Sequence, residues 1–365
     1  MTFLIKRKVN NFLRSDTSTH IPSTKKIDVR KVTALWGFSE AALGGILHAL
    51  KVPFTGIFIG GAAIIFITLI ANSSNNKTQI LKSTLLVILV KAIVSPYTPL
   101  TAYFAVILQG VLGYILFSLI SYQKAAAVIL GFLSLTFASL QKLIVLTVLF
   151  GTSLWKAIDV FIKYVLDQIG VINLHPSLNF SYILISIYCG IHILSGIFIG
   201  IKAAGLQNNL LKKSDLLDQK YFLLNQHEEL FKEKKKKRKK YWWYKPSGIV
   251  LLAISIITMI ISYFSPQLSK VKTLDILFMI IRSLIITFVW FSIVSPFIIK
   301  YFKKIIEKNK FRYASEIDQI TELFPGFRLT INYCWKKTDH LKGISRIRQF
   351  LSDSLAALLT YEPTD

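Results

Sequence analysis

Glu40 is an ionisable side chain inside an apolar run that extends from about residue 33 to residue 50. A charged group is costly in the hydrocarbon core of a bilayer, so a carboxylate in such a run is a candidate for ligand or proton chemistry. Gly44 and His48 follow at i+4 and i+8, which places all three on one helix face, with roughly 12 Å between its ends. The spacing predicts a polar face on the first membrane-spanning helix.

Four more polar side chains lie within later apolar runs, namely Lys91, Gln109, Lys142 and His192. The expected topology places Lys91, Lys142 and His48 toward the outer ends of their helices and the other three candidates nearer mid-depth. If they converge, they line a polar cavity in the outer half of the bundle, suited to a small ligand with a carboxylate or phosphate. Alternatively, the lysines extend to the outer headgroups and the histidines are hydrogen-bonded core residues.

Small residues at four-residue spacing predict close contacts between helices. One such stripe lies beside the polar face of the first helix and consists of Ala41, Gly45 and Ala49. Gly56 and Gly60 repeat the spacing on the second predicted helix, and Gly196 and Gly200 repeat it on the sixth. These residues are therefore predicted helix-contact positions.

Enzyme motifs are missing from the sequence. It contains no P-loop, HExxH, GxSxG or paired CxxC motif, so we expect neither an ATPase nor another enzyme. Cys189 and Cys334 have no spacing typical of a disulfide framework or a metal site, and both are interpreted as free thiols. No metal and no cofactor is expected.

The apolar runs that carry these residues are long enough to cross a bilayer. A mean hydropathy of +0.52 with 53% hydrophobic residues is too apolar for a soluble chain. We expect an all-α polytopic membrane protein, with a six-helix bundle, a two-helix membrane hairpin and a cytoplasmic helical tail. The predicted spans are 33–50, 53–71, 81–95, 99–121, 125–149, 180–204, 247–264 and 274–299.

Charge sets the expected domains and orientation. Cations lie mainly outside the apolar runs, as the positive-inside rule requires, and the net charge is +25. We therefore expect an inner (cytoplasmic) membrane protein with both termini in the cytoplasm. The expected segments are a basic arm (1–31), the bundle (32–205), a basic linker (206–245), the hairpin (246–300) and the tail (301–365).

Two segments outside the spans have distinctive patterns. Trp155–Ile169 is amphipathic and is predicted either to lie on the outer membrane surface or to pack on the bundle. Lys234–Lys240 is a run of seven cations followed by four aromatic residues, typical of an interfacial anchor that attracts anionic lipid. Because this run adjoins a span and lacks a recognition module, nucleic acid is not an expected partner.

The first block resembles a known transporter family. The stretches ALWGFSEAALGGILHALKVPFTGIFIGG (34–61) and SPYTPLTAYFAVILQGVLGYILF (95–117) look like the substrate-binding S component of energy-coupling-factor vitamin transporters. The likeness covers roughly residues 30–205 and rests on six closely spaced helices, small residues on helix one and a Pro-rich outer loop. It implies that Ala41, Gly45 and Ala49 contact a membrane partner subunit, and that the outer loops at 51–55 and 95–99 gate the ligand.

The second block departs from that family, because S components end after the sixth helix. A hairpin with a cytoplasmic tail is similar to a reduced coupling subunit, whose helices dock on ATPases through Ala-Arg motifs. The nearest match is Ser345-Arg346, and Arg346 and Arg348 are the candidate partner-docking residues. In the tail, Pro325-Gly326 predicts a turn.

Two functions from different classes fit these patterns. The first is a transport protein that binds a small, anionic ligand and is coupled to a separate cytoplasmic nucleotide hydrolase. The second is a structural or assembly subunit of a cell-envelope membrane complex, in which the small-residue stripes serve helix contacts and the basic tail binds a partner.

Overall fold

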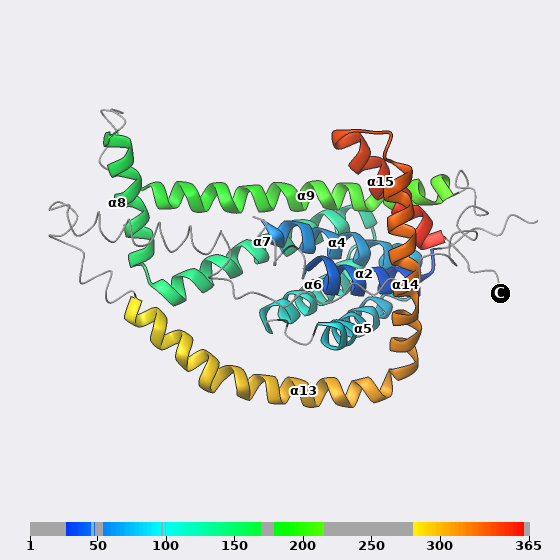
Figure 1. Cartoon of the computed structure of the whole chain (residues 1–365), viewed down its shortest axis with the longest axis horizontal. Coiled ribbons are helices and arrows are strands. Elements are labelled where there is room, and N and C mark those ends of the chain that lie inside the picture. Colours follow the sequence, from blue (N-terminus) through cyan, green and yellow to red (C-terminus); the bar gives the residue numbers. More distant parts are fainter. Residues whose placement is uncertain are drawn as a thin grey trace, which may run out of the picture.

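The computed structural model describes residues 27–44, 47, 54–95, 98, 100–168, 179–214 and 280–360 (Figure 1). All regular structure in these ranges is helical. The helices are α2 (Val29–Phe38), α4 (Thr55–Ser73), α5 (Thr78–Val94), α6 (Leu100–Leu119), α7 (Gln123–Phe150), α8 (Ser153–Gln168), α9 (Phe180–Ser214), α13 (Ser295–Arg312), α14 (Ala314–Lys337) and α15 (Gly343–Thr360). Two π-helical turns, η1 (Ser39–Leu43) and η3 (Trp290–Val294), are continuous with helices.

Five of the described helices are long and apolar enough to span a membrane. They are α4, α6, α7, α9 and the continuous helix from Ile280 to Arg312 that includes α13. The prediction of an all-helical fold is therefore confirmed for the described residues, and several of their helices are long and apolar enough to span a membrane. The division into six helices and a hairpin stays a prediction, because the expected span at 247–264 lies outside the described residues.

The long helices run side by side, and two others cross their ends (Figure 1). α7 packs along α9, and α4 packs on both. α2 lies against α4 and α5, while α6 fills the space between α5 and α7. α8 crosses one end of this bundle and α14 crosses the other, so the spanning direction runs from α8 to α14.

Glycines allow the closest helix contact, which is between α7 and α9. A Cβ atom added at Gly131 would clash with the Gly196 carbonyl, and one added at Gly196 would clash with the Gly131 carbonyl. A Cβ atom at Gly200 would lie 2.5 Å from the carbonyl oxygen of Ala127. The backbones therefore touch, as small residues permit in membrane helices.

The C-terminal helices cover the end of the bundle that α14 crosses. Phe324 and Phe327 on α14 make edge contacts with Phe38 on α2, at centroid distances of 5.3 and 6.3 Å. The turn predicted at Pro325-Gly326 is wrong, since α14 continues through both residues. Proline costs a helix a backbone hydrogen bond, and the packing of the flanking phenylalanines on α2 offsets that cost.

α15 is tied to the end of α9. The Lys213 ammonium lies 2.6 Å from an Asp353 carboxylate oxygen and donates a hydrogen bond of 2.9 Å to the Ser352 hydroxyl. Asp353 is buried, with 3% of its surface exposed. The described part of the predicted tail is thus helical and belongs to the same packed body as the bundle.

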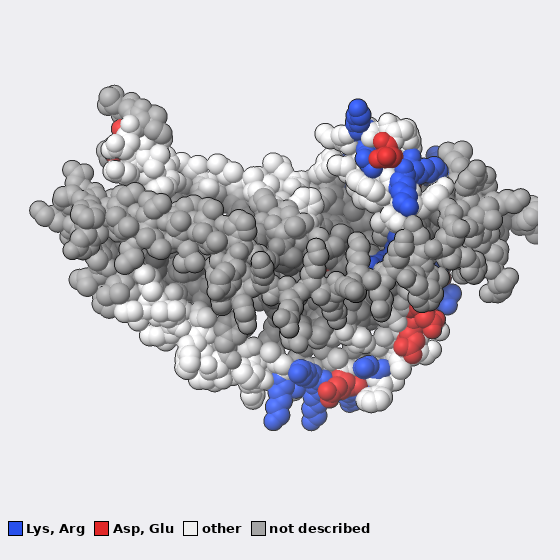
Figure 2. All heavy atoms as spheres, viewed as in Figure 1, with Lys and Arg blue, Asp and Glu red and all other residues white. Residues whose placement is uncertain are grey.

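The amphipathic segment at the opposite end forms α8 and packs on α7 and α9. The Trp155 indole donates a hydrogen bond of 3.0 Å to the Thr147 hydroxyl on α7. Asp159 accepts hydrogen bonds from the backbone and hydroxyl of Ser181, in the first turn of α9. In the space-filling view, Lys and Arg side chains gather instead on α13, α14 and α15 (Figure 2).

Candidate functional site

A buried ion pair joins η1 to α5. The Lys91 ammonium lies 2.6 Å from a carboxylate oxygen of Glu40, and the geometry is that of a charge-assisted hydrogen bond. Glu40 is 3% exposed and Lys91 is 4% exposed. The two side chains come from positions 51 residues apart in the sequence, so the fold itself brings them together.

A second polar link fixes the register of the two helices. The Thr33 hydroxyl on α2 donates a buried hydrogen bond of 2.8 Å to the Ser83 hydroxyl on α5. Glu40 follows Thr33 by seven residues and Lys91 follows Ser83 by eight, which is roughly two helical turns on each chain. Both helices run in the same direction, so the Thr33–Ser83 hydrogen bond sets a register that brings Glu40 and Lys91 to the same level, two turns further along.

A π-helical turn presents Glu40. The Gly44 amide donates its hydrogen bond to the Ser39 carbonyl, five residues earlier, instead of to residue 40. Such a turn holds one extra residue and changes the direction in which the following side chains point. π-helical turns of this kind often occur at functional sites.

Close packing and an aromatic ring surround the pair. A Cβ atom at Gly37 would lie 3.3 Å from Val90, so the glycine lets α2 approach α5 next to Lys91. The Lys91 ammonium lies 5.9 Å from the ring centroid of Tyr103 on α6, within range of a cation–π interaction. The Tyr103 ring in turn packs on Phe302 of α13, at a centroid distance of 5.0 Å.

Both partners of the pair therefore have neighbours that contact the second half of the chain. Phe38, two residues before Glu40, contacts α14. Tyr103, which contacts Lys91, packs on α13. α13 and α14 are consecutive helices, separated by Tyr313. A displacement of these helices would consequently act on both sides of the pair.

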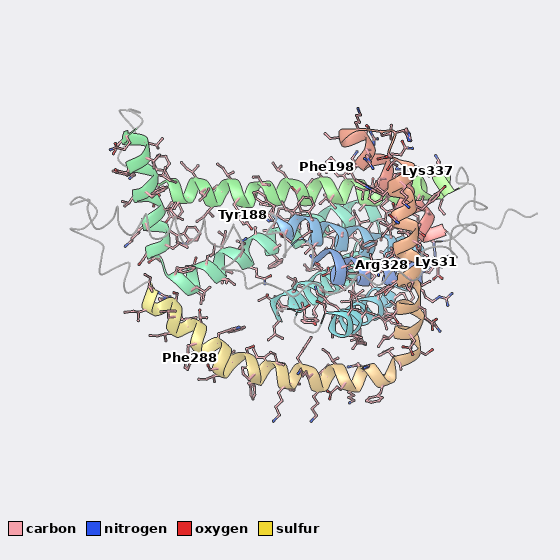
Figure 3. All side chains as sticks on the ribbon, viewed as in Figure 1. Lys31, Tyr188, Phe198, Phe288, Arg328 and Lys337 are labelled. Carbon is pink, nitrogen blue, oxygen red and sulfur yellow. The ribbon has the colours of Figure 1, made fainter. Side chains whose placement is uncertain are left out.

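The remaining candidate ligand residues lie in different surroundings. Gln109 is 6% exposed and lies on the same buried face of α6 as Tyr103, beside Gly60 of α4. His192 is 1% exposed, and its Nδ1 atom lies 2.9 Å from the Tyr188 carbonyl. Its ring is part of an aromatic cluster with Tyr188, which Figure 3 labels on α9, and with Phe54.

Two candidates do not join the pair in the described structure. Lys142 is exposed on α7. His48 lies outside the described residues. The fold thus brings Glu40 and Lys91 together. A cavity lined by all six candidate ligand residues stays a prediction.

The candidate helix-contact residues divide in a similar way. Ala41 is buried in η1, at 9% exposure, whereas Gly45 and Ala49 lie outside the described residues. Gly196 and Gly200 lie in the contact between α7 and α9 described above.

The candidate docking residues lie on α15. The Arg346 guanidinium lies 2.8 Å from an Asp339 carboxylate oxygen and stacks 4.2 Å above the Trp335 ring centroid. Arg348 is exposed. Arg346 is therefore held within its own chain, and Arg348 projects into the surroundings.

Sequence reasoning named both members of the pair but not their contact. Glu40 is the one carboxylate within the predicted spans of the first block, and the few lysines on the other spans were the signal from which a pair could have been inferred. Tyr103 and Phe302 were missed, because aromatic residues in apolar runs carry no distinguishing signal.

No cluster of three or more histidine, cysteine or acidic side chains that could hold a metal ion occurs in the part of the chain that the structure describes. Comparisons with protein-family models, with curated proteins and with solved structures gave no match.

Proposed function

We propose that this chain is a membrane transport protein that binds a small anionic ligand at Lys91 and is coupled to a separate cytoplasmic nucleotide hydrolase. The buried Glu40–Lys91 pair is the observation that supports this proposal. Ionisable residues inside membrane bundles are costly and are found where substrates or ions are handled. Apolar side chains could hold the same two helices together at a lower cost in free energy.

In this proposal the ligand replaces Glu40 as the partner of Lys91. A carboxylate or phosphate offers the ammonium the same type of charge-assisted hydrogen bond that Glu40 provides. Tyr103 stays in contact with the ammonium during the exchange and keeps it inside the bundle. Glu40 moves away with the π turn, whose extra residue makes it the irregular point of the first helix.

The energy source acts from the end of the bundle that α14 crosses. α14 contacts Phe38 through Phe324 and Phe327, and it is also linked to α5 by the Lys82–Glu316 ion pair at 3.3 Å. A hydrolase that moves α14 would therefore move both helices that carry the pair. This path provides a physical route from the cytoplasm to the site.

The alternative function is a structural or assembly subunit of an envelope complex. It is favoured by the closed state of the pair, in which each charge already satisfies the other at 2.6 Å. In that case the pair only fixes helix register, together with the link between Thr33 and Ser83.

Copurification distinguishes the two functions. The tagged chain is isolated from its native membrane in mild detergent, and bound small anions and stoichiometric protein partners are identified by mass spectrometry. The test variant is Glu40→Gln/Lys91→Gln, which removes both charges and leaves neither partner unpaired. Lys142→Gln is the matched control, since Lys142 is also a spanning-helix lysine but is exposed.

For a transport protein we expect a bound anion and a nucleotide hydrolase with the native chain and with Lys142→Gln. The double variant should lose the anion but keep the hydrolase. A large stoichiometric envelope assembly, with no anion bound to any of the three proteins, would contradict transport and favour the structural role.

A further inference from the structure

The junction of α14 and α15 exposes apolar side chains on one side. On α15, Ile344 is 85% exposed, and Ile347 and Leu351 are each 52% exposed. Their spacing of three and four residues places them on one helix face. Trp335, at the end of α14, is 44% exposed. We refer to residues 335–351 as the α14–α15 corner.

The corner is also strongly cationic. It contains five Lys and Arg residues and one acidic residue, Asp339, which is paired with Arg346. Lys342, just before α15, and Arg348, within it, are both exposed. Figure 2 shows blue side chains gathered over this part of the surface, at the upper right of the view. Exposed apolar and cationic groups thus occupy the same small surface.

The position of the corner relates this surface to the membrane. The C-terminal half of α15 is fixed to the end of α9 by the Lys213–Asp353 pair. Its first turns extend from α14 toward the spanning helices, to the level of Phe198, which Figure 3 labels on α9. Phe198 is 60% exposed, and the Lys202 ammonium lies 5.5 Å from its ring centroid. Lysine side chains near the end of a membrane span extend toward the headgroups, which relates the level of Lys202 and Phe198 to the boundary between acyl chains and headgroups.

We propose that the α14–α15 corner lies in the headgroup layer of the bilayer and binds anionic lipids. Ile344, Ile347 and Leu351 insert among the upper acyl groups, as the apolar face of an interfacial helix does. Trp335 lies at headgroup level, which tryptophan favours. Lys342 and Arg348 bind the lipid phosphates, and charge complementarity selects anionic lipids over zwitterionic ones. This role replaces the protein-docking role predicted for Arg348 and is independent of the proposed transport function.

A spin label at residue 344 tests the proposal. The full chain carries Ile344→Cys, with Cys189 and Cys334 replaced by alanine, and is reconstituted in nanodiscs of phosphatidylcholine with or without phosphatidylglycerol. Accessibility of the label to oxygen, which partitions into lipid, is compared with accessibility to a water-soluble nickel chelate. Gln349→Cys is the matched control, because residue 349 is also exposed but lies on the opposite side of α15.

We expect the label at residue 344 to be more accessible to oxygen than to the chelate. The label at residue 349 should be more accessible to the chelate. Phosphatidylglycerol should increase the contrast, and Lys342→Gln/Arg348→Gln should abolish that increase. Equal access of the chelate to both labels in both lipid compositions would overturn the proposal. If the label at residue 344 is accessible to the chelate in nanodiscs but inaccessible to it in native membranes, the proposal is also overturned, in favour of a protein partner.

Discussion

The Glu40–Lys91 pair makes a quantitative prediction about single and double substitutions. Lys91→Met leaves a carboxylate with 3% exposure and no cation, and Glu40→Gln leaves an ammonium with 4% exposure and no anion. Removing one partner of a buried pair costs about 3–5 kcal/mol in the free energy of unfolding. Replacing both partners with uncharged side chains of similar volume is often nearly neutral.

The two substitutions should therefore not be additive. Each single variant is expected to lose about 3 kcal/mol or more, whereas Glu40→Gln/Lys91→Met should lose about 1 kcal/mol. The coupling free energy is then about 5 kcal/mol, which is the sum of the single losses minus the loss of the double variant. The free energy of unfolding is measured by titration with sodium dodecyl sulfate in mixed micelles, followed by circular dichroism. Lys142→Gln is the control and should change it by less than about 0.5 kcal/mol. Additive losses would refute a direct pairing of Glu40 with Lys91.

Three more predictions concern other parts of the fold. Gly131→Ala should lower the free energy of unfolding by about 1–3 kcal/mol, because the methyl group clashes with α9, whereas Gly190→Ala meets no described atom within 4 Å and should not lower it. Asp353→Asn should release α15 from α9 and increase its amide hydrogen exchange, whereas Asp339→Asn, at a side chain that is 77% exposed, should not. Burial raises the pKa of the Cys334 thiol, so the folded protein should be alkylated slowly by maleimide. Above the ordinary thiol pKa of 9.0 the unfolded chain loses this proton before the folded chain does, so the free energy of unfolding should fall as pH rises. Fast alkylation of Cys334 in the folded protein at pH 8 would contradict the burial of this thiol.

The predictable part of the fold came from hydrophobic length. Runs of apolar residues predicted α4, α6, α7 and α9 to within a few residues at most ends, because a bilayer requires a minimum span and tolerates few charges. α9 extends ten residues beyond its predicted end at 204, since its last turns are polar and pack on α15. Length and hydropathy carry no signal for such a contact.

Packing partners were the part that could not be predicted. The sequence identified Glu40 and Lys91 as costly charges but gave no register between their helices, which the Thr33–Ser83 hydrogen bond supplies. The π turn at Ser39–Leu43 also changes the periodicity on which the Glu40, Gly44 and His48 stripe was based. The turn expected at Pro325 failed because tertiary contacts of Phe324 and Phe327 outweighed a local preference.

The unequal lengths of the spanning helices have a consequence for the thickness of the surrounding bilayer. α4 has 19 residues and is about 28 Å long, which matches a hydrocarbon core of about 30 Å. α9 has 35 residues and is about 52 Å long, so it must project well beyond that core. The projecting end holds α15, whose depth relative to the headgroup layer is therefore fixed by α9. A thinner or thicker bilayer would shift that depth, and the protein should respond to hydrophobic mismatch first at its α14–α15 end.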